Sequence, residues 1–243
     1  MDSTSNSPLD VVLLVGGLGT RLRSVLGDST PKALALIKGR PFLWYLLHHI
    51  AAQGFDQVTL ATAHLSDSFK EDLQSYVPEG MTIQFSFEAS PRGTGGAIVQ
   101  AYGVVQSSPF IAMNGDVFVK VPLQQMVEEH RRTGAKATLA IVEVDNVARF
   151  GTVRADDDHQ IEAFLEKTGI ESPGWISAGV YVLSAEALSE IMEMEVSSIE
   201  RDVFPKLVGN GLYAFPVISP FIDIGLPETL EAAGKFFEEC GYA

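Results

Sequence analysis

The feature that most constrains the fold is a short apolar run that ends in paired glycines. Residues 11–15 read Val-Val-Leu-Leu-Val and lead directly into Gly16 and Gly17. A continuous, β-branched run of this length is typical of a strand that is buried on both faces of a parallel sheet. It is far too short to cross a bilayer. We therefore expect residues 11–15 to form a fully buried strand of a parallel sheet.

Strand and helix patterns alternate through the first 145 residues. Further strands are predicted at 57–61, 82–87, 109–113 and 137–142, and helices at 41–53, 66–76, 94–104 and 122–132. This alternation favours a parallel, doubly wound sheet over residues 9–145. Later strands are predicted at 151–153, 160–165, 175–183 and 213–217, and helices at 185–192, 199–207 and 227–239. We expect this strand-rich half to extend the same sheet as an antiparallel or mixed region.

The two halves are not separated by a Pro-, Gly- or Ser-rich linker. We therefore expect one domain over residues 9–243, preceded by a flexible, Ser-rich leader at 1–8. The leader lacks the basic and apolar regions of a signal peptide, so a cytoplasmic protein is expected. Cys240 is the single cysteine, which excludes an intrachain disulfide and a site with several cysteine ligands.

The charge balance narrows the range of partners. Seventeen basic and 31 acidic residues give a formal net charge of −14. An acidic chain is a poor non-specific binder of nucleic acid or of an anionic membrane, so neither is expected as a partner. If the protein handles phosphates, it must bind them in a local cradle.

A first candidate cradle follows the opening strand. In an open α/β sheet, ligands bind at the carboxyl ends of strands. The glycine-rich turn at 16–19 would let main-chain N–H groups approach an anion, and Arg21 and Lys32 could add positive charge. The spacing is neither that of a P-loop nor that of the dinucleotide-binding fingerprint. The alternative is a tight turn with solvated basic residues.

A second candidate site is the segment 88–96, Glu-Ala-Ser-Pro-Arg-Gly-Thr-Gly-Gly, again between a strand and a helix. Its glycines permit close approach to a planar base. The Glu88 carboxylate could accept hydrogen bonds from two adjacent N–H donors of guanine, whereas the single N–H of uracil or thymine suits an amide better. The alternative is that Glu88 is a solvated loop acid.

Two isolated acids form a third candidate site. Asp116 follows the buried strand predicted at 109–113, and Asp223 lies inside the apolar segment 221–225. An acid in an apolar run is rarely free unless it is paired or binds a metal. Mg²⁺ prefers a few carboxylates together with phosphate oxygens and water. Taken singly, each acid could also be a turn or capping residue.

The segments 16–24, 30–32 and 39–43 resemble the sugar-1-phosphate nucleotidyltransferases, and most of all the D-glycero-D-manno-heptose 1-phosphate guanylyltransferases. The resemblance implies the nucleotide-diphospho-sugar transferase fold, a Rossmann-like doubly wound mixed sheet. The nucleotide-binding part would span about 9–145 and the sugar-binding part about 146–243. The reaction implied is NTP plus sugar 1-phosphate giving NDP-sugar and pyrophosphate, here with GTP, to supply a bacterial surface polysaccharide or glycoprotein.

The resemblance also implies roles for individual residues. Asp116 and Asp223 would hold Mg²⁺, and Arg21 and Lys32 would bind the phosphates. The nucleotide would contact Gly16, Gly17, Gly19, Thr20, Glu88, Gly93 and Thr94. The sugar phosphate would contact Gly151, Glu166, Lys167, Ser177, Gly179 and Glu200. Arg92, Phe221 and Leu226 stand where the family has Leu, Trp and Thr. The pair Glu166-Lys167 could instead be a solvated ion pair, and Glu200 part of a helix cap.

The expected chemistry is an in-line attack of a sugar-phosphate oxygen on the α-phosphorus of GTP. The attacking phosphate is already anionic at pH 7, so no general base is needed. Mannose 1-phosphate guanylyltransferase and N-acetylmuramate 1-phosphate uridylyltransferase activities are alternatives, as is a non-catalytic nucleotide-sugar sensor. Phe236 and Phe237 are expected to pack in the core or, less readily, to form the contact of a homodimer.

Overall fold

The computed structural model describes residues 9–17, 20–27, 31–62, 73–88, 90, 92–165, 169, 171–193 and 197–242. Its centre is strand β1 (Asp10–Leu14), which pairs in parallel with β4 (Gln57–Thr62) on one side and β6 (Phe110–Asn114) on the other. Beyond β4, strand β5 (Thr82–Phe87) pairs in parallel. Val11, Val12 and Leu13 of β1 are fully buried. The expected fully buried parallel strand is confirmed, and it lies between β4 and β6.

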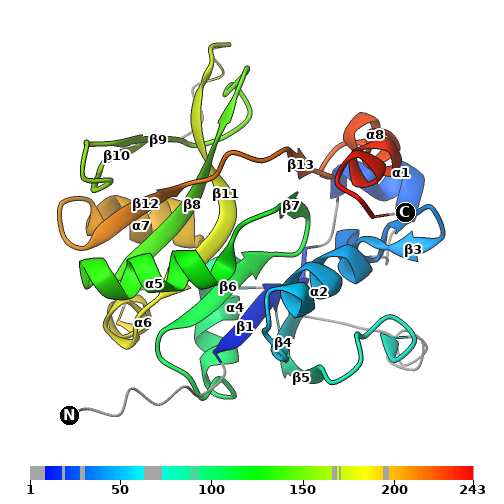
Figure 1. The fold of residues 1–243 in the computed structure, drawn as a ribbon, viewed down its shortest axis with the longest axis horizontal. Helices are drawn as coiled ribbons and strands as arrows, with labels where there is room; N and C mark the ends of the chain where they lie inside the picture. The colour runs from blue at the N-terminus through cyan, green and yellow to red at the C-terminus, as the bar shows by residue number, and fades with distance from the viewer. Residues whose placement is uncertain are drawn as a thin grey trace.

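The second half of the chain extends the same nine-stranded sheet (Figure 1). Strand β11 (Gly174–Leu183) runs antiparallel to β6 and to β8 (Ala137–Val144), and β12 (Leu212–Pro216) runs parallel to β8. Strands β9 (Thr152–Ala155) and β10 (Ile161–Leu165) form a hairpin beside the start of β11. The mixed extension is as expected. One expectation was wrong. Strand β8 was expected in the parallel sheet of the first half, but it pairs antiparallel with β11, which lies between β8 and β6.

Helices cover both faces of the sheet, as Figure 1 shows. Val11 and Leu13 belong to a core formed with α2 (Phe42–Ala52), α5 (Leu123–Thr133) and α8 (Pro227–Glu239). Val12 points to the other core, formed with α4 (Gly93–Tyr102), α6 (Ala185–Met192) and α7 (Phe204–Leu207). Because successive side chains of a strand alternate between faces, β1 supplies both cores.

Several short elements complete the fold. They are η1 (Thr20–Leu22), α1 (Arg23–Leu26), η2 (Lys32–Leu34), β2 (Leu36–Ile37), β3 (Arg40–Pro41), β7 (Val117–Val119), η3 (Ile199–Val203) and β13 (Phe221–Asp223). The single helix expected over 199–207 is instead a π-helical turn followed by α7, which begins at a proline-containing first turn. Most of the helix expected over 66–76 lies outside the described residues.

The C-terminal aromatic residues close the first core. Phe237 is fully buried and stacks on Tyr45, with ring centroids 3.7 Å apart, and it also meets the edge of Phe42. Phe237 is therefore a core residue and is not available for a dimer contact. Among the helices of the described residues, none has both the length and the apolar character needed to cross a membrane.

Candidate active site

Two adjoining cavities open near the carboxyl ends of β1 and β6. The larger, of about 390 Å³, is lined by Gly16, Gly17, Glu88, Gly93 and Thr94, among others. The smaller, of about 220 Å³, is lined by Arg21, Arg149, Gly151, Ser177, Gly179, Glu200 and Asp223, among others. Lys32, Asn114 and Asp116 line both cavities. The structure thus brings most of the predicted site residues together, and two of them, Lys32 and Asp116, lie at the junction with Asn114, which was not predicted.

The glycine turn after β1 forms part of the wall of the larger cavity. A Cβ atom added at Gly17 would meet nothing within 4 Å, so this glycine leaves open space beside the main chain. Gly115, for which the sequence predicted no role, is instead enclosed by neighbouring atoms. Its N–H donates to the Leu14 carbonyl (3.0 Å), and a Cβ there would lie 2.7 Å from that oxygen. Gly19 lies outside the described residues, as does the side chain of Thr20.

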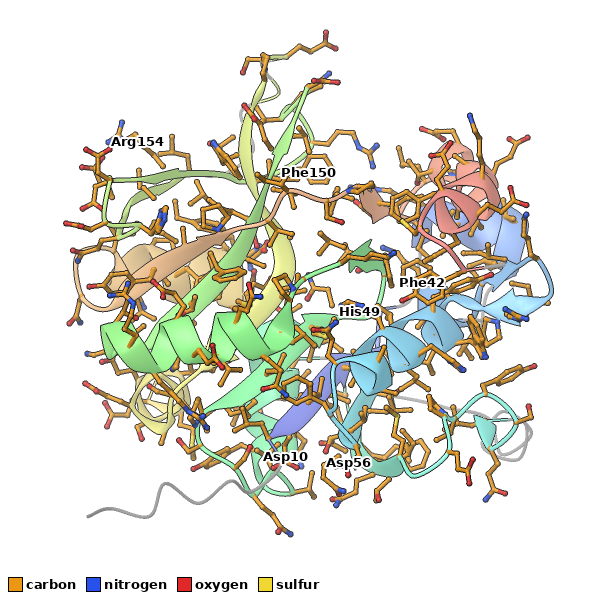
Figure 2. The ribbon with its side chains drawn as sticks, viewed as in Figure 1. Asp10, Phe42, His49, Asp56, Phe150 and Arg154 are labelled. Atoms are coloured by element: carbon orange, nitrogen blue, oxygen red, sulfur yellow. The ribbon has the colours of Figure 1, made fainter. Side chains whose placement is uncertain are left out.

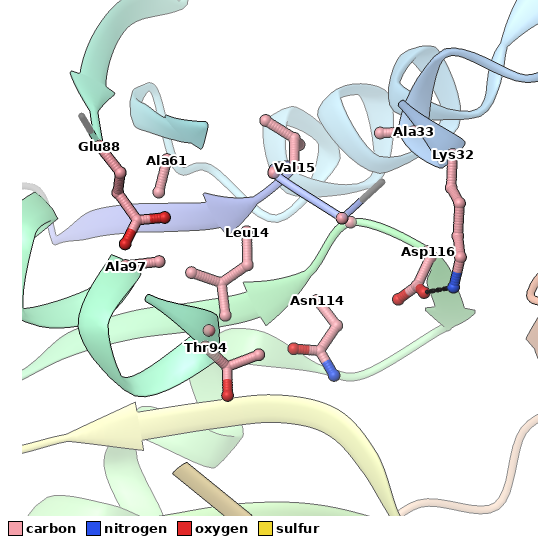
Figure 3. A pocket seen from close by; sticks show the side chains of 14 residues that line it. Leu14, Val15, Lys32, Ala33, Ala61, Glu88, Thr94, Ala97, Asn114 and Asp116 are labelled. Atoms are coloured by element: carbon pink, nitrogen blue, oxygen red, sulfur yellow. Dashed lines mark hydrogen bonds and ion pairs between the residues drawn. The ribbon is translucent and has the colours of Figure 1, made fainter. Parts of the chain in front are cut away.

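Glu88 lies at the end of the larger cavity that is opposite the Lys32–Asp116 pair (Figure 3). It follows β5, and its N–H donates to the Thr62 carbonyl (3.0 Å). The residue is 7% exposed, so it is not a solvated loop acid. Burial raises the pKa of its carboxyl, against the opposing effect of Arg92. Its Oε1 atom is buried and has no hydrogen-bond partner among the described residues, although a buried carboxylate oxygen requires donors.

Gly93 and Thr94 line the same cavity but also hold the chain together. The φ angle of Gly93 is +72°, and a Cβ there would lie 1.9 Å from the Ser197 carbonyl oxygen. The Thr94 hydroxyl accepts a hydrogen bond from the N–H of Ile199 (3.0 Å). The segment that begins at Ser197 is thereby fixed to the start of α4. A glycine is therefore required at position 93 because the Ser197 carbonyl of the same chain lies close to it, whether or not a ligand is bound.

Lys32 and Asp116 form an ion pair at the junction of the two cavities. The Lys32 Nζ atom lies 2.6 Å from Asp116 Oδ2 (Figure 3), and both side chains are largely buried. The sequence predicted both residues for the site but did not predict their contact. In this arrangement Lys32 neutralises an acid at the junction of the two cavities.

Asp223 reaches the smaller cavity because β13 pairs with β7. Asp223 is opposite Val117 in this antiparallel ladder, and the N–H of Ile224 donates to the Asp116 carbonyl (3.0 Å). Asp223 Oδ1 accepts a hydrogen bond from the N–H of Gly225 (2.7 Å). Burial raises the pKa of the Asp223 carboxyl, and the charge of Asp116 raises it further. Two acids from distant segments therefore share one electrostatic environment.

A buried hydrogen-bond network supports the far wall of the smaller cavity. The Tyr181 hydroxyl donates to Glu200 Oε1 (2.8 Å), and burial holds the pKa of this fully buried phenol well above its usual range. Gly179 has a φ angle of +69°, and a Cβ there would lie 2.7 Å from Asn114 Nδ2. Asn114 Oδ1 is buried and lacks a partner among the described residues. Tyr181 was not predicted for the site.

The remaining residues predicted for the sugar fall into two groups. Gly151 and Ser177 line the smaller cavity, and Ser177 Oγ accepts a weak hydrogen bond from the N–H of Gly179 (3.4 Å). Glu166 and Lys167 lie outside the described residues.

A model of the nucleotidyl transferase family matches residues 10–239. The chain belongs to the nucleotidyl transferase family. It is 37% identical to the D-glycero-alpha-D-manno-heptose 1-phosphate guanylyltransferase of Aneurinibacillus thermoaerophilus, over 93% of this chain and 97% of that protein. It is also 37% identical to the mannose-1-phosphate guanylyltransferase of Mycobacterium tuberculosis, over 90% of this chain but only 62% of the relative's length. The chain thus spans less than two thirds of the latter protein.

Two solved structures share the fold of this chain. HddC from Yersinia pseudotuberculosis, crystallised with GMP-PN, is 35% identical and superposes with a TM-score of 0.81 over 94% of this chain and 99% of that chain. The UTP-bound UGPase from Acinetobacter baumannii superposes with a TM-score of 0.78 over 96% of this chain and 98% of that chain, at 20% identity. The likeness to UGPase supports the fold alone.

The donors at the cavity junction fit a hard divalent cation. Asp116 and Asp223 supply carboxylate oxygens, and the mutual repulsion that raises the Asp223 pKa would be relieved by positive charge between them. The described residues contain no group of three or more His, Cys, Asp or Glu side chains able to enclose a metal. This pattern suits Mg²⁺, which is commonly bound by one or two carboxylates together with substrate phosphates and water.

Arg149 is a further site residue that was not predicted. Its guanidinium lies 3.8 Å from Asp223 Oδ2, with Nη2 the nearest atom, and its side chain is 42% exposed. In the sequence it lies two residues before Gly151, which the family resemblance assigns to the sugar phosphate. This position in the sequence was the signal that could have identified Arg149 as a site residue.

Proposed function

We propose that the chain transfers a guanylyl group from GTP to a sugar 1-phosphate, releasing pyrophosphate and forming a GDP-sugar. The observation that carries this proposal is the pair of adjoining cavities joined at Lys32, Asn114 and Asp116. A nucleotide in the larger cavity would place its phosphates at the junction. A sugar phosphate in the smaller cavity would approach the same junction from the other side, which is the arrangement that a direct transfer requires.

Glu88 supports guanine as the base. Its Oε1 atom is buried at the end of the larger cavity, away from the junction, and accepts no hydrogen bond from the described residues. The N1–H and N2–H groups of guanine can donate to the two oxygens of one carboxylate, whereas uracil presents one N–H between two carbonyls. The names of relatives that are 37% identical point the same way.

Two related sugars are candidates for the acceptor. We place D-glycero-α-D-manno-heptose 1-phosphate first, because the guanylyltransferase of that substrate matches this chain over 97% of its own length. Mannose 1-phosphate is second, supported by equal identity over a smaller share of the relative. The two names share the manno configuration, so a carboxylate such as Glu200 could contact the hydroxyls common to both sugars.

The chain's own residues would act mainly by position and charge. Arg21 and Lys32 would offset the negative charge of the triphosphate and of the leaving pyrophosphate. For Lys32 this requires its Nζ atom to exchange Asp116 for a phosphate oxygen. Glu200, held by Tyr181, would orient the sugar from the opposite wall. The attacking phosphate oxygen is already anionic, so no side chain has to remove a proton.

Asp116 and Asp223 are the residues that would hold Mg²⁺. When bound, the ion would neutralise charge on the phosphates and help to align them. Displacement of Lys32 from Asp116 would free the carboxylate for this role and the ammonium group for the phosphates.

Turnover with a matrix of substrates tests the proposed function. GTP, UTP, dTTP and ATP would each be combined with heptose, mannose, glucose and N-acetylmuramate 1-phosphates, and pyrophosphate release and product mass would be measured. We expect turnover with GTP and the manno-configured acceptors. More efficient use of UTP than of GTP would overturn the guanine assignment. Tight binding of a GDP-sugar without any turnover would indicate a sensor.

The cellular compartment of the reaction is proposed from where its substrates are found. GTP and Mg²⁺ are available in the cytoplasm, where we place the protein. A homodimer remains a proposal that does not involve Phe237, and light scattering coupled to gel filtration would test it.

A further inference from the structure

We propose that Arg149 binds the phosphate of the sugar 1-phosphate acceptor. This inference rests on the proposed function, because it assigns a residue to the acceptor side of the same reaction. The first observation is that the site is divided into two cavities. Arg149 lines the smaller cavity with Gly151, Ser177 and Glu200, and it does not line the cavity that contains Glu88. The guanidinium therefore faces the acceptor and not the base of the nucleotide.

The guanidinium is held in position but keeps its hydrogen-bond donors. The distance of 3.8 Å to Asp223 Oδ2 allows electrostatic attraction but exceeds a hydrogen bond. The guanidinium carbon lies 5.7 Å from the centre of the Phe150 ring, which in turn meets the edge of Phe221 at 5.8 Å. Within the described residues Arg149 donates no hydrogen bond. A cation oriented by an acid and an aromatic ring, with free donors, is suited to bind an oxyanion.

Among the described residues, the other cations that line the smaller cavity are less suited to the acceptor phosphate. Lys32 is already paired with Asp116 at 2.6 Å and stands at the junction, where the nucleotide phosphates would lie. Arg21 also lines the smaller cavity alone, but it follows the glycine turn that borders the nucleotide cavity, and no contact with Asp223 is found for it among the described residues. Arg149 is beside Asp223, on the acceptor side of the junction. Its planar fork can make two parallel hydrogen bonds to one phosphate, which a lysine cannot do.

Arg154 is a control residue that carries the same charge as Arg149 but lies away from the site. It lies on β9, five residues further along the chain, and its exposed side chain pairs with Glu162 at 3.1 Å. Figure 2 shows Arg154 at the edge of the molecule, whereas Phe150, next to Arg149, lies over its centre. Arg154 does not line either cavity. Removal of its charge changes the net charge equally without touching the site.

The kinetic test compares Arg149→Gln, Arg149→Lys and Arg154→Gln with the unaltered protein. For Arg149→Gln we expect KM for the sugar 1-phosphate to rise about 10- to 100-fold, the range for loss of a hydrogen bond to a charged group, while KM for GTP changes less than about 2-fold. Arg149→Lys should recover part of the loss, and Arg154→Gln should leave both constants unchanged. An unchanged acceptor KM, or an equal rise for GTP, would overturn the assignment.

A binding test does not depend on turnover. Each protein would be saturated with the α,β-methylene analogue of GTP, which cannot release pyrophosphate, and titrated with mannose 1-phosphate or with mannose in a thermal-shift assay. We expect a rise in Tm that requires the phosphate and is lost in Arg149→Gln but kept in Arg154→Gln. If this pattern holds without catalysis in the substrate matrix, the proposed function fails and the Arg149 assignment stands. A shift that is absent, or that Arg149→Gln retains, would contradict it.

Discussion

Asp116 and Asp223 reach the same cavity because the main chain holds their segments side by side. The Ile224 N–H donates to the Asp116 carbonyl, and β13 pairs with β7 at Asp223 and Val117. The segments that carry the two carboxyl groups are thus held together by main-chain hydrogen bonds. Such preorganisation lets a charged site exist before its ligand arrives, at the cost of repulsion between the acids.

The first prediction concerns turnover. Asp116→Asn and Asp223→Asn each remove a negative charge from the proposed Mg²⁺ site, so each should lower kcat/KM by at least about 100-fold, since metal stabilisation of phosphate charge is worth several kcal/mol. Pyrophosphate release measures the effect. Asp56→Asn, at an exposed residue remote from both cavities, is the control. Activity of either site variant within about 5-fold of the unaltered protein would refute the metal assignment.

The second prediction concerns stability. Burial and Asp116 together raise the Asp223 pKa, so the charged form of Asp223 is less favourable in the folded chain than in the unfolded chain. Its charge therefore lowers the free energy of unfolding at pH 7, above the ordinary pKa of an aspartic acid. Measured in EDTA, the Tm of Asp223→Asn should equal or exceed that of the unaltered protein, whereas its activity, measured with Mg²⁺, should be lost. A fall of several degrees in calorimetry would show that the carboxylate stabilises the fold.

The third prediction is a pH dependence of GTP binding. Burial raises the pKa of the Glu88 carboxyl, so it becomes protonated at a higher pH than an ordinary glutamic acid. A protonated Glu88 cannot accept from both guanine donors, and KM for GTP should rise as the pH is lowered from 7. Glu88→Gln should raise KM for GTP at pH 7 by about 10-fold and remove this part of the pH dependence. An identical pH profile in the variant would count against Glu88 as the base-recognising residue.

The sequence predicted those parts of the fold that depend on local pattern. The apolar run of β1 and the glycine turn after it could be identified because burial on both faces leaves a continuous signal. Strands β7 and β13 could not, because each has three residues and is stabilised by pairing with a partner far along the chain. The same limit hid the position of β11 between β6 and β8.

The site residues divide in a similar way. Asp116, Asp223 and Glu88 stood out as acids next to apolar strands or glycine-rich turns, but the Lys32–Asp116 contact depends on tertiary structure. Tyr181 was hidden because it lies in the apolar run of β11, where an aromatic residue looks like core. Gly93 and Gly179 were noticed as glycines, yet the atoms that exclude a Cβ belong to Ser197 and Asn114.

The fourth prediction tests that explanation of Gly93. Alanine at this position would need a φ angle near +72° and would place Cβ 1.9 Å from the Ser197 carbonyl oxygen. We expect Gly93→Ala to lower the free energy of unfolding by roughly 2–4 kcal/mol, from backbone strain and steric overlap. Gly103→Ala is the matched control at the other end of α4, where φ is −60° and a Cβ makes an ordinary contact. Denaturant unfolding would compare them, and equal stabilities would contradict the steric argument.

The fifth prediction separates positioning of Glu200 from general packing. The buried Tyr181 hydroxyl donates to Glu200 Oε1, so Tyr181→Phe removes the hydrogen bond while keeping the ring. A hydrogen bond to a charged group contributes about 1.5–3 kcal/mol, so KM for the sugar 1-phosphate should rise about 10-fold or more, with KM for GTP nearly unchanged. Tyr102→Phe, on α4 and outside both cavities, removes a phenol without touching Glu200. If Tyr181→Phe lowers Tm but leaves the acceptor KM as it was, the hydroxyl serves the fold and not the position of Glu200.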